Sequence, residues 1–130
     1  MKRIFIFLVL ISIASTTMIS GQKGTRDTLK VGKDSMEYEL IIIDPEFEGW
    51  LSTKPSMNYH SNEFYRQRNI RYVQEWNHRF RSPDRYGDLY ETYIDYRPNI
   101  DYEIELNYRL YYYFVYFEEK NRVRLISRVR

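Results

Sequence analysis

The first 21 residues have the three-part pattern of a secretory signal peptide, and this pattern determines which part of the chain remains to fold after export. Lys2 and Arg3 precede an apolar run over residues 4–13 that only Ser12 interrupts, and small residues dominate residues 14–21. The apolar run has about ten residues, whereas a membrane-spanning helix needs roughly 20. We therefore expect cleavage near residue 21, export to the periplasm, the cell envelope or the medium, and a product that is not an integral membrane protein.

A single small domain without disulfides is expected after cleavage. Removal of 21 residues from the chain of 130 leaves 109, enough for one domain. The chain has no cysteine, which excludes both disulfides and a lipid-bearing cysteine. We expect a flexible leader over residues 22–35, which are polar and contain two glycines, and one globular domain over residues 36–130.

Residues 61–81 carry the pattern of a long amphipathic helix. Ser61 is a suitable N-cap, and Asn69 is a polar gap in an otherwise apolar stripe. The residues 82–84 (Ser-Pro-Asp) end the pattern. A short helix is expected over residues 45–53, because Asp-Pro-Glu supplies an N-cap, a proline at the first helical position and an acidic first turn.

A second long helix is expected over residues 101–120, with Asp101 as its cap. Its apolar residues recur at helical spacing. Lys120 lies near the C-terminal end, where a positive charge interacts favourably with the helix dipole. Tyrosine and phenylalanine also favour strands, so residues 108–117 have a strand as the rival interpretation. We prefer the helix, because alternation in a strand would leave three large side chains exposed on one face, namely Tyr111, Tyr113 and Val115.

Two or three strands complete the predicted α+β fold. The sequence MEYELIII at residues 36–43 contains three consecutive β-branched isoleucines, which favour a buried strand. Residues 123–126 are a candidate for a last strand beside it. Residues 89–96 are either a strand or an aromatic loop. The expected architecture is a single domain of two longer helices, one short helix and two or three strands.

The charges and aromatic residues offer one candidate partner surface. Arg68, Arg71, Trp76 and Tyr112 are the residues that we expect to contact a partner, through fork-like arginine contacts and ring stacking. The favoured alternative is internal pairing, in which the helix arginines meet the acidic segments 37–48 and 88–105. Without the two basic residues of the signal peptide the chain has 18 basic and 18 acidic side chains, so nucleic acid is not an expected partner.

Catalytic and metal-binding patterns are weak in this sequence. Glu75 and His78 have the spacing of a di-iron half-site, but the chain has only two histidines. His60 adjoins Ser61, which is better explained as a helix cap than as a nucleophile. We therefore expect no metal and no cofactor, and we assign no catalytic residue.

Three stretches resemble a known family: YELIIIDPEFEGWL at residues 38–51, MNYHSNEFYRQRNIRYVQEWNHRF at residues 57–80, and IDYRPNIDYEIELNYRLYYYFVYFEEK at residues 94–120. They are similar to a family of small uncharacterised exported proteins of Bacteroidota, a domain of unknown function. The resemblance implies a bacterial envelope setting. We expect a non-enzymatic binding or structural component of the envelope, with an envelope protein or an anionic glycan or lipid as its partner. The alternative is a small periplasmic enzyme that uses carboxylates such as Glu75 or Asp95.

Overall fold

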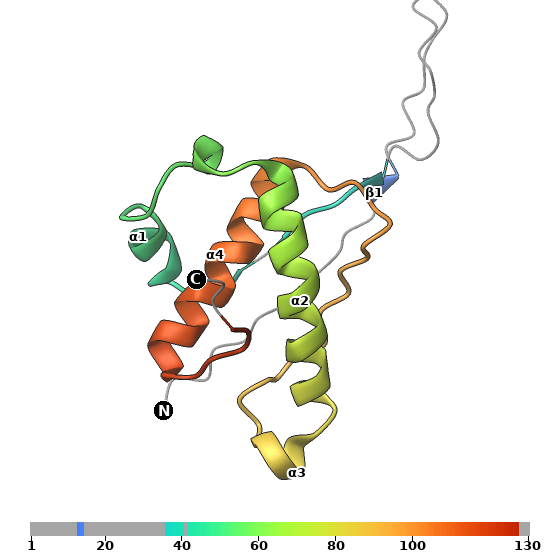
Figure 1. Cartoon of the computed structure of the whole chain (residues 1–130), viewed down its shortest axis with the longest axis vertical. Coiled ribbons are helices and arrows are strands. Elements are labelled where there is room, and N and C mark those ends of the chain that lie inside the picture. Colours follow the sequence, from blue (N-terminus) through green and yellow to red (C-terminus); the bar gives the residue numbers. More distant parts are fainter. Residues whose placement is uncertain (1–12, 15–35, 41, 128–130) are drawn as a thin grey trace, which may run out of the picture.

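The computed structural model describes residues 13–14, 36–40 and 42–127, and the helices make up most of this part of the chain (Figure 1). In chain order the helices are α1 (Phe47–Leu51), the 3-10 helix η1 (Met57–Tyr59), α2 (Asn62–Phe80), α3 (Pro83–Tyr86) and α4 (Ile104–Asn121). The two longer helices and the short helix predicted from the sequence are thereby confirmed. The predicted signal peptide and leader lie outside the described residues, apart from Ile13 and Ala14.

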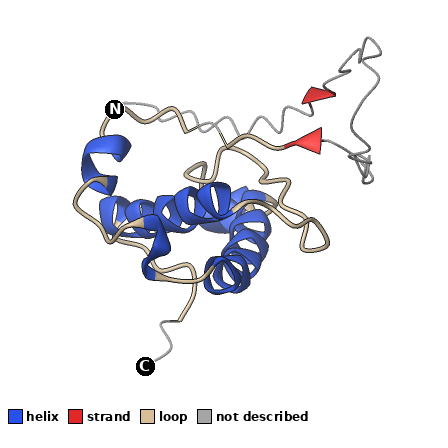
Figure 2. Ribbon diagram, turned by 90° about the horizontal axis from the view of Figure 1, so that it is seen from above, coloured by secondary structure: helices blue, strands red, loops and turns tan. Residues whose placement is uncertain are grey.

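The predicted α+β class is wrong, because the described strands form no sheet against the helices. β1 (Ile13–Ala14) pairs antiparallel with β2 (Met36–Glu37), and each strand has two residues. This pairing lies away from the helices (Figure 2). The strand predicted over residues 36–43 extends no further than Glu37 among the described residues, so the isoleucine-rich segment that leads to α1 is irregular there.

The two long helices, α2 and α4, lie side by side and hold most of the core between them (Figures 1 and 2). Ser61 caps α2 as predicted, since its Oγ accepts a hydrogen bond from the Phe64 N–H at 3.1 Å. The predicted cap of the second helix is wrong: α4 has Glu103, not Asp101, at its N-cap position, and the Glu103 side chain makes no cap bond. Residues 108–117 are helical, so the strand interpretation of this segment is wrong.

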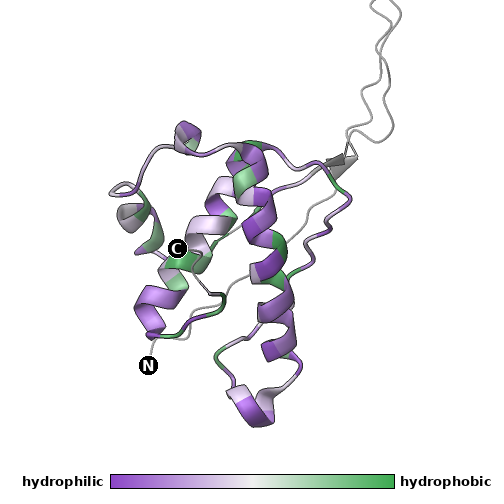
Figure 3. Cartoon of the chain, viewed as in Figure 1, coloured by the Kyte–Doolittle hydropathy of each residue, from purple (hydrophilic) through white to green (hydrophobic). Residues whose placement is uncertain are grey.

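Aromatic rings build the core between α2 and α4. Trp76 is fully buried, and its ring packs against those of Phe117 and Tyr90 at centroid distances of 4.6 and 5.1 Å. Tyr72 of α2 stacks on Phe114 of α4 at 4.8 Å. The long helices are largely purple or pale when coloured by hydropathy, because charged and amide residues alternate in them with tyrosine and tryptophan, which count as mildly hydrophilic (Figure 3). Offset and edge-to-face packing of such rings stabilises this interior.

α1 packs on α4 and not on α2 (Figure 1). Its anchor is Phe47, which is fully buried and meets the rings of Tyr113 and Tyr116 at 5.8 and 5.6 Å. The buried Asp44 precedes this helix, and its Oδ1 accepts a hydrogen bond from the Glu46 N–H at 3.0 Å. The predicted capping role of Asp44 therefore takes the form of a tight turn just before α1.

Residues 89–96 form a loop because side chains of α2 satisfy their backbone groups. Trp76 Nε1 donates to the Thr92 carbonyl at 2.7 Å, and Asn77 bonds to both backbone groups of Ile94. These bonds occupy the positions that a neighbouring strand would fill. The question left open by the sequence is thus decided in favour of a loop.

The strand predicted over residues 123–126 is also wrong. α4 ends at Asn121, its C-cap Arg122 is in the left-handed conformation with φ of 54°, and the chain then turns back toward the helix. Leu125 is buried, and its N–H donates to Glu118 Oε2 at 2.9 Å. A side chain of α4 again takes the place of a strand partner.

Candidate functional site

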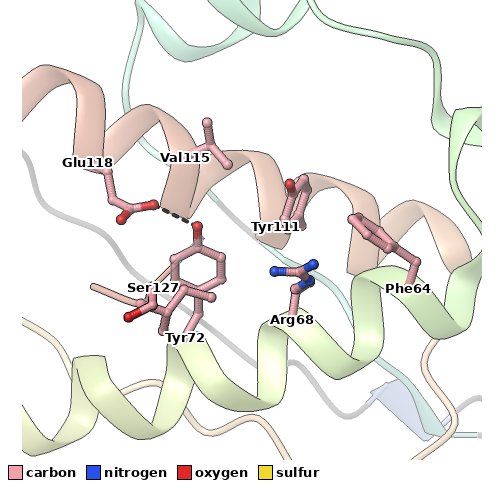
Figure 4. Close-up of a pocket in the computed structure, with 8 residues that line it drawn as sticks. Phe64, Arg68, Tyr72, Tyr111, Val115, Glu118 and Ser127 are labelled. Carbon is pink, nitrogen blue, oxygen red and sulfur yellow. Dashed lines mark hydrogen bonds between the residues drawn. The ribbon is translucent and has the colours of Figure 1, made fainter. Parts of the chain in front are cut away.

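A pocket of about 360 Å³ opens between α2 and α4 near the end of the described chain (Figure 4). A volume of this size is within the range of small-ligand sites, roughly 300–1,000 Å³. Its walls come from α2, from α4 and from the segment that follows α4. The lining residues are Phe64, Arg68, Tyr72, Tyr111, Val115, Glu118, Ile126 and Ser127.

Helical spacing explains why these side chains share one space. Phe64, Arg68 and Tyr72 are four residues apart along α2, so they stand above one another on one face. The row on α4 has steps of four and three residues and contains Tyr111, Val115 and Glu118. The pocket is therefore the edge of the α2–α4 interface, where the two rows separate.

Three aromatic rings, those of Phe64, Tyr72 and Tyr111, contribute to its walls. Phe64 and Tyr111 face each other across the helices at a centroid distance of 5.6 Å and an interplanar angle of 71°. Tyr72 and Tyr111 are 6.2 Å apart at 63°. These edge-to-face contacts hold the three rings in fixed directions, so the apolar faces that remain open are preformed.

Glu118 closes one end of the pocket and has both oxygens hydrogen-bonded. Tyr72 donates its hydroxyl proton to Oε1 at 2.6 Å (Figure 4), and the Leu125 N–H donates to Oε2 at 2.9 Å. The carboxylate thus joins α2, α4 and the terminal segment. Two donors stabilise its negative charge in place.

Arg68 brings a cation into this aromatic pocket. Its side chain extends from α2 toward Tyr111 (Figure 4), and its guanidinium carbon lies 5.2 Å from the Phe64 ring centroid. Within the described residues Arg68 makes no ion pair and no hydrogen bond to another group. A guanidinium has five N–H donors in a fork that matches carboxylate and phosphate groups.

Two of the other three arginines of α2 differ from Arg68, because each forms an ion pair within the helix. Arg79 binds Glu75 at 2.8 Å, and Arg66 pairs with Glu63 at 3.3 Å. We predicted that the helix arginines pair with the acidic segments 37–48 and 88–105. Among the described residues this prediction is wrong, because the α2 arginines that form ion pairs bind glutamates of α2 itself. Segment 37–48 instead pairs with α4, through Arg109 with Glu48 and Lys120 with Asp44.

The structure places the four predicted partner-binding residues in different surroundings. Arg68 lines the pocket, and Arg71 is exposed on α2 three residues further on. Trp76 is fully buried, and Tyr112 is 6% exposed and packs edge to face on Tyr108 at 5.0 Å. Burial raises the pKa of Tyr112 to about 12. Of the four residues, only Arg68 therefore lines the pocket.

Arg68 is the one lining residue that the predicted partner surface contains. Tyr111 enters the sequence analysis only as a side chain that a strand would leave exposed. Glu118 had no distinguishing signal, because its position depends on the return of the chain after α4. The four-residue spacing of Phe64, Arg68 and Tyr72 was the one available indication.

The candidate catalytic carboxylates lie elsewhere and have arginine partners. Glu75 accepts a hydrogen bond from Arg79, and Asp95 accepts one from Arg97 at 3.2 Å. His60 stacks on Phe64 at 3.9 Å, and the hydroxyl of Ser61 is used as a helix cap. Within the described residues no group of three histidines, cysteines or acids is placed to hold a metal ion.

The fold and the pocket together define a small helical domain with a cavity that three aromatic rings, an arginine and a glutamate help to line. The chain belongs to the family of unknown function DUF6146, whose model matches residues 2–129. This match confirms the resemblance to a domain of unknown function. No curated protein and no solved structure matches the chain. In the described part of the chain no helix is both long enough and apolar enough to cross a membrane.

Proposed function

We propose that the protein is an exported, non-enzymatic binding component of the bacterial cell envelope. Its α2–α4 pocket holds an anionic group, a carboxylate or a phosphate, that belongs to an envelope ligand. The observation that carries this proposal is the Arg68 guanidinium, which enters an aromatic pocket without a carboxylate partner among the described residues. The export itself rests on the signal-peptide pattern of residues 1–21.

The chemistry of the site supports an anion as the bound group. A half-buried guanidinium gains most from a charged acceptor, because hydrogen bonds between charged groups are roughly twice as strong as neutral ones. Phe64 and Tyr111 exclude water from part of this space, which strengthens such a contact. Arg71 is exposed on the same helix and adds a second positive charge.

The carboxylate of Glu118 is compatible with an anionic ligand. Its two oxygens already accept hydrogen bonds from Tyr72 and Leu125. These donors stabilise the negative charge and direct the carboxylate toward the terminal segment. Arg68, by contrast, donates no hydrogen bond to another group of the described residues.

A carboxylate enzyme has less support than a binding protein. Glu75 and Asp95, the acids that the sequence suggested, are not among the lining residues of the pocket. Each has an arginine partner instead. No observation in the described residues favours either as a general acid or base.

Titration calorimetry on the full chain tests the proposal. The probes are galacturonic acid, glucose 1-phosphate and vesicles of phosphatidylglycerol. We expect at least one probe to bind and Arg68→Gln to weaken it by about ten- to a hundredfold, because a hydrogen bond to a charged group contributes roughly 1.5–3 kcal/mol.

Arg85→Gln is the matched control, because Arg85 is exposed on α3 and does not line the pocket. It is expected to bind within about twofold of the wild type, as surface substitutions away from a site usually have small effects. Equal binding by Arg68→Gln and the wild type would contradict the proposal. Fractionation of the host, with mass spectrometry of the chain's N-terminus, tests export.

A further inference from the structure

A run of aromatic rings leaves the pocket at Phe64 and continues onto the surface. The imidazole of His60 stacks on the Phe64 ring at a centroid distance of 3.9 Å and an interplanar angle of 16°. Tyr59 meets His60 at 4.7 Å and 83°. Phe64 therefore belongs to two surfaces, the wall of the pocket and the start of this run.

The outer end of the run is exposed. Tyr59 is 67% exposed, more than the other exposed large hydrophobic side chains of the described residues, Ile43, Leu89 and Tyr93. The Tyr59 ring is not part of the hydrophobic core. Exposed aromatic residues beyond the needs of the core are a feature of binding surfaces.

The segment that carries Tyr59 is fixed to the helices. Tyr65 of α2 donates to the Met57 carbonyl at 3.0 Å, and Tyr108 of α4 donates to the Pro55 carbonyl at 2.9 Å. The Tyr59 N–H bonds to the Ser56 carbonyl at 2.9 Å. These bonds hold the run in place before a ligand arrives, which lowers the entropy cost of binding.

The chemistry of the run fits linked sugar rings better than a lipid. A pyranose has a flat face of C–H groups that packs on an aromatic face, and an edge of hydroxyls that hydrogen-bonds to groups such as the Tyr59 hydroxyl and the His60 imidazole. An acyl chain has no hydroxyls to use these groups, and it gains most where water is excluded, whereas Tyr59 is open to solvent.

We propose that the ligand of the α2–α4 pocket is an anionic glycan of at least two linked sugars. The acidic sugar lies against Arg68 and Tyr111, and the next sugar stacks on His60 and Tyr59. This inference rests on the proposed function, because it takes Arg68 as the anion-binding group. It adds the class of ligand and a second subsite outside the pocket.

The test compares oligomers of one to five units. Calorimetry on the full chain uses oligomers of galacturonic, mannuronic and guluronic acid, and vesicles of phosphatidylglycerol. For the wild type we expect at least one series to gain about three- to tenfold in affinity from one unit to two or three, the contribution of one aromatic contact. Tyr59→Ala removes this gain and leaves the affinity for the single unit unchanged.

Tyr93→Ala is the matched control, because Tyr93 is also an exposed tyrosine and does not line the pocket. We expect Tyr93→Ala to keep the gain in affinity from one sugar unit to two or three. Circular dichroism is the check on folding, and we expect each variant to be folded because the substituted side chains are exposed.

The outcomes separate the two proposals. Affinity that depends on Arg68 but not on chain length, or that Tyr59→Ala does not change, would overturn the second subsite and leave the proposed function intact. Binding to vesicles alone would overturn the glycan ligand and keep the anion site. Absence of binding to every probe would overturn both.

Discussion

Asn77 of α2 pairs with the main chain of Ile94 as a strand residue would. Its Nδ2 donates to the Ile94 carbonyl at 2.9 Å, and its Oδ1 accepts the Ile94 N–H at 2.9 Å. Both residues are buried. One helix side chain thus satisfies a donor and an acceptor of the loop, which is why a loop can lie against the core without belonging to a sheet.

Substitution of Asn77 by alanine tests this pairing. Asn77→Ala leaves a buried N–H and a buried C=O without partners, and we expect the free energy of unfolding in urea to fall by about 2–4 kcal/mol. Asn58→Ala, an exposed asparagine of η1, is the control and is expected to change it by less than about 0.5 kcal/mol. Equal effects of the two substitutions would contradict the role of Asn77.

Trp76 is expected to contribute to stability and not to ligand contact. Trp76→Phe removes volume from the core and the hydrogen bond to the Thr92 carbonyl, at a cost of about 2–4 kcal/mol of unfolding free energy. The other tryptophan, Trp50, remains as a fluorescent probe of urea unfolding. The folded variant should bind the ligand with unchanged affinity. A loss of affinity without a loss of stability would place Trp76 at the binding surface.

Lys120 balances the buried charge of Asp44. The Asp44 side chain is 2% exposed, and Lys120 Nζ lies 3.3 Å from its Oδ2. Lys120→Met removes the partner of a buried carboxylate, and we expect a loss of about 3 kcal/mol in unfolding free energy. Asp44→Asn combined with Lys120→Met should lose less than the lysine substitution alone. Additive losses in this double-mutant cycle would show that the two groups do not interact.

Alkaline pH is expected to destabilise the fold through buried tyrosines. Burial raises the pKa of Tyr112 and that of Tyr96 to about 12, whereas an unfolded tyrosine has a pKa near 10. Between about pH 10 and pH 12 the folded state therefore binds more protons than the unfolded state, so the free energy of unfolding falls as the pH rises. Each such tyrosine contributes a fall of up to about 1.4 kcal/mol per pH unit.

Tyr112→Phe checks this dependence, because its hydroxyl makes no hydrogen bond within the described residues. Urea unfolding at intervals from pH 8 to pH 12 should give a shallower fall for this variant than for the wild type. Tyr93→Phe, at an exposed tyrosine, should keep the steeper fall. Coincident profiles for Tyr112→Phe and the wild type would count against a buried titrating hydroxyl at this position.

The helices were predictable because their signals are local. Ser61, the apolar stripe that follows it and the proline after Ser82 define α2 within a few residues of its observed ends. The strands were not predictable, because the preference of β-branched residues for sheets depends on a neighbouring strand. Here the neighbours are side chains such as Asn77, and the sequence shows such a residue only as a polar gap in a helix.

The site was only partly predictable. The stripe of α2 does not show which aromatic rings face the core and which face its edge, so Trp76 and Tyr112 were assigned to the surface although both are buried. Arg68 was identified for its charge. Its place in a pocket depends on Tyr111 from α4 and on the chain after Arg122, and these meet only in the folded protein.

The most direct test of the central claim is a nuclear magnetic resonance titration that follows the Arg68 side-chain Nε–H signal of the full chain. The titrant is the uronic acid oligomer or sugar phosphate that binds most tightly in calorimetry. We predict that this signal shifts with the same dissociation constant as the binding, together with ring signals of Phe64 and Tyr111. A ligand that binds while these signals stay unchanged would contradict the assignment of the α2–α4 pocket as the binding site.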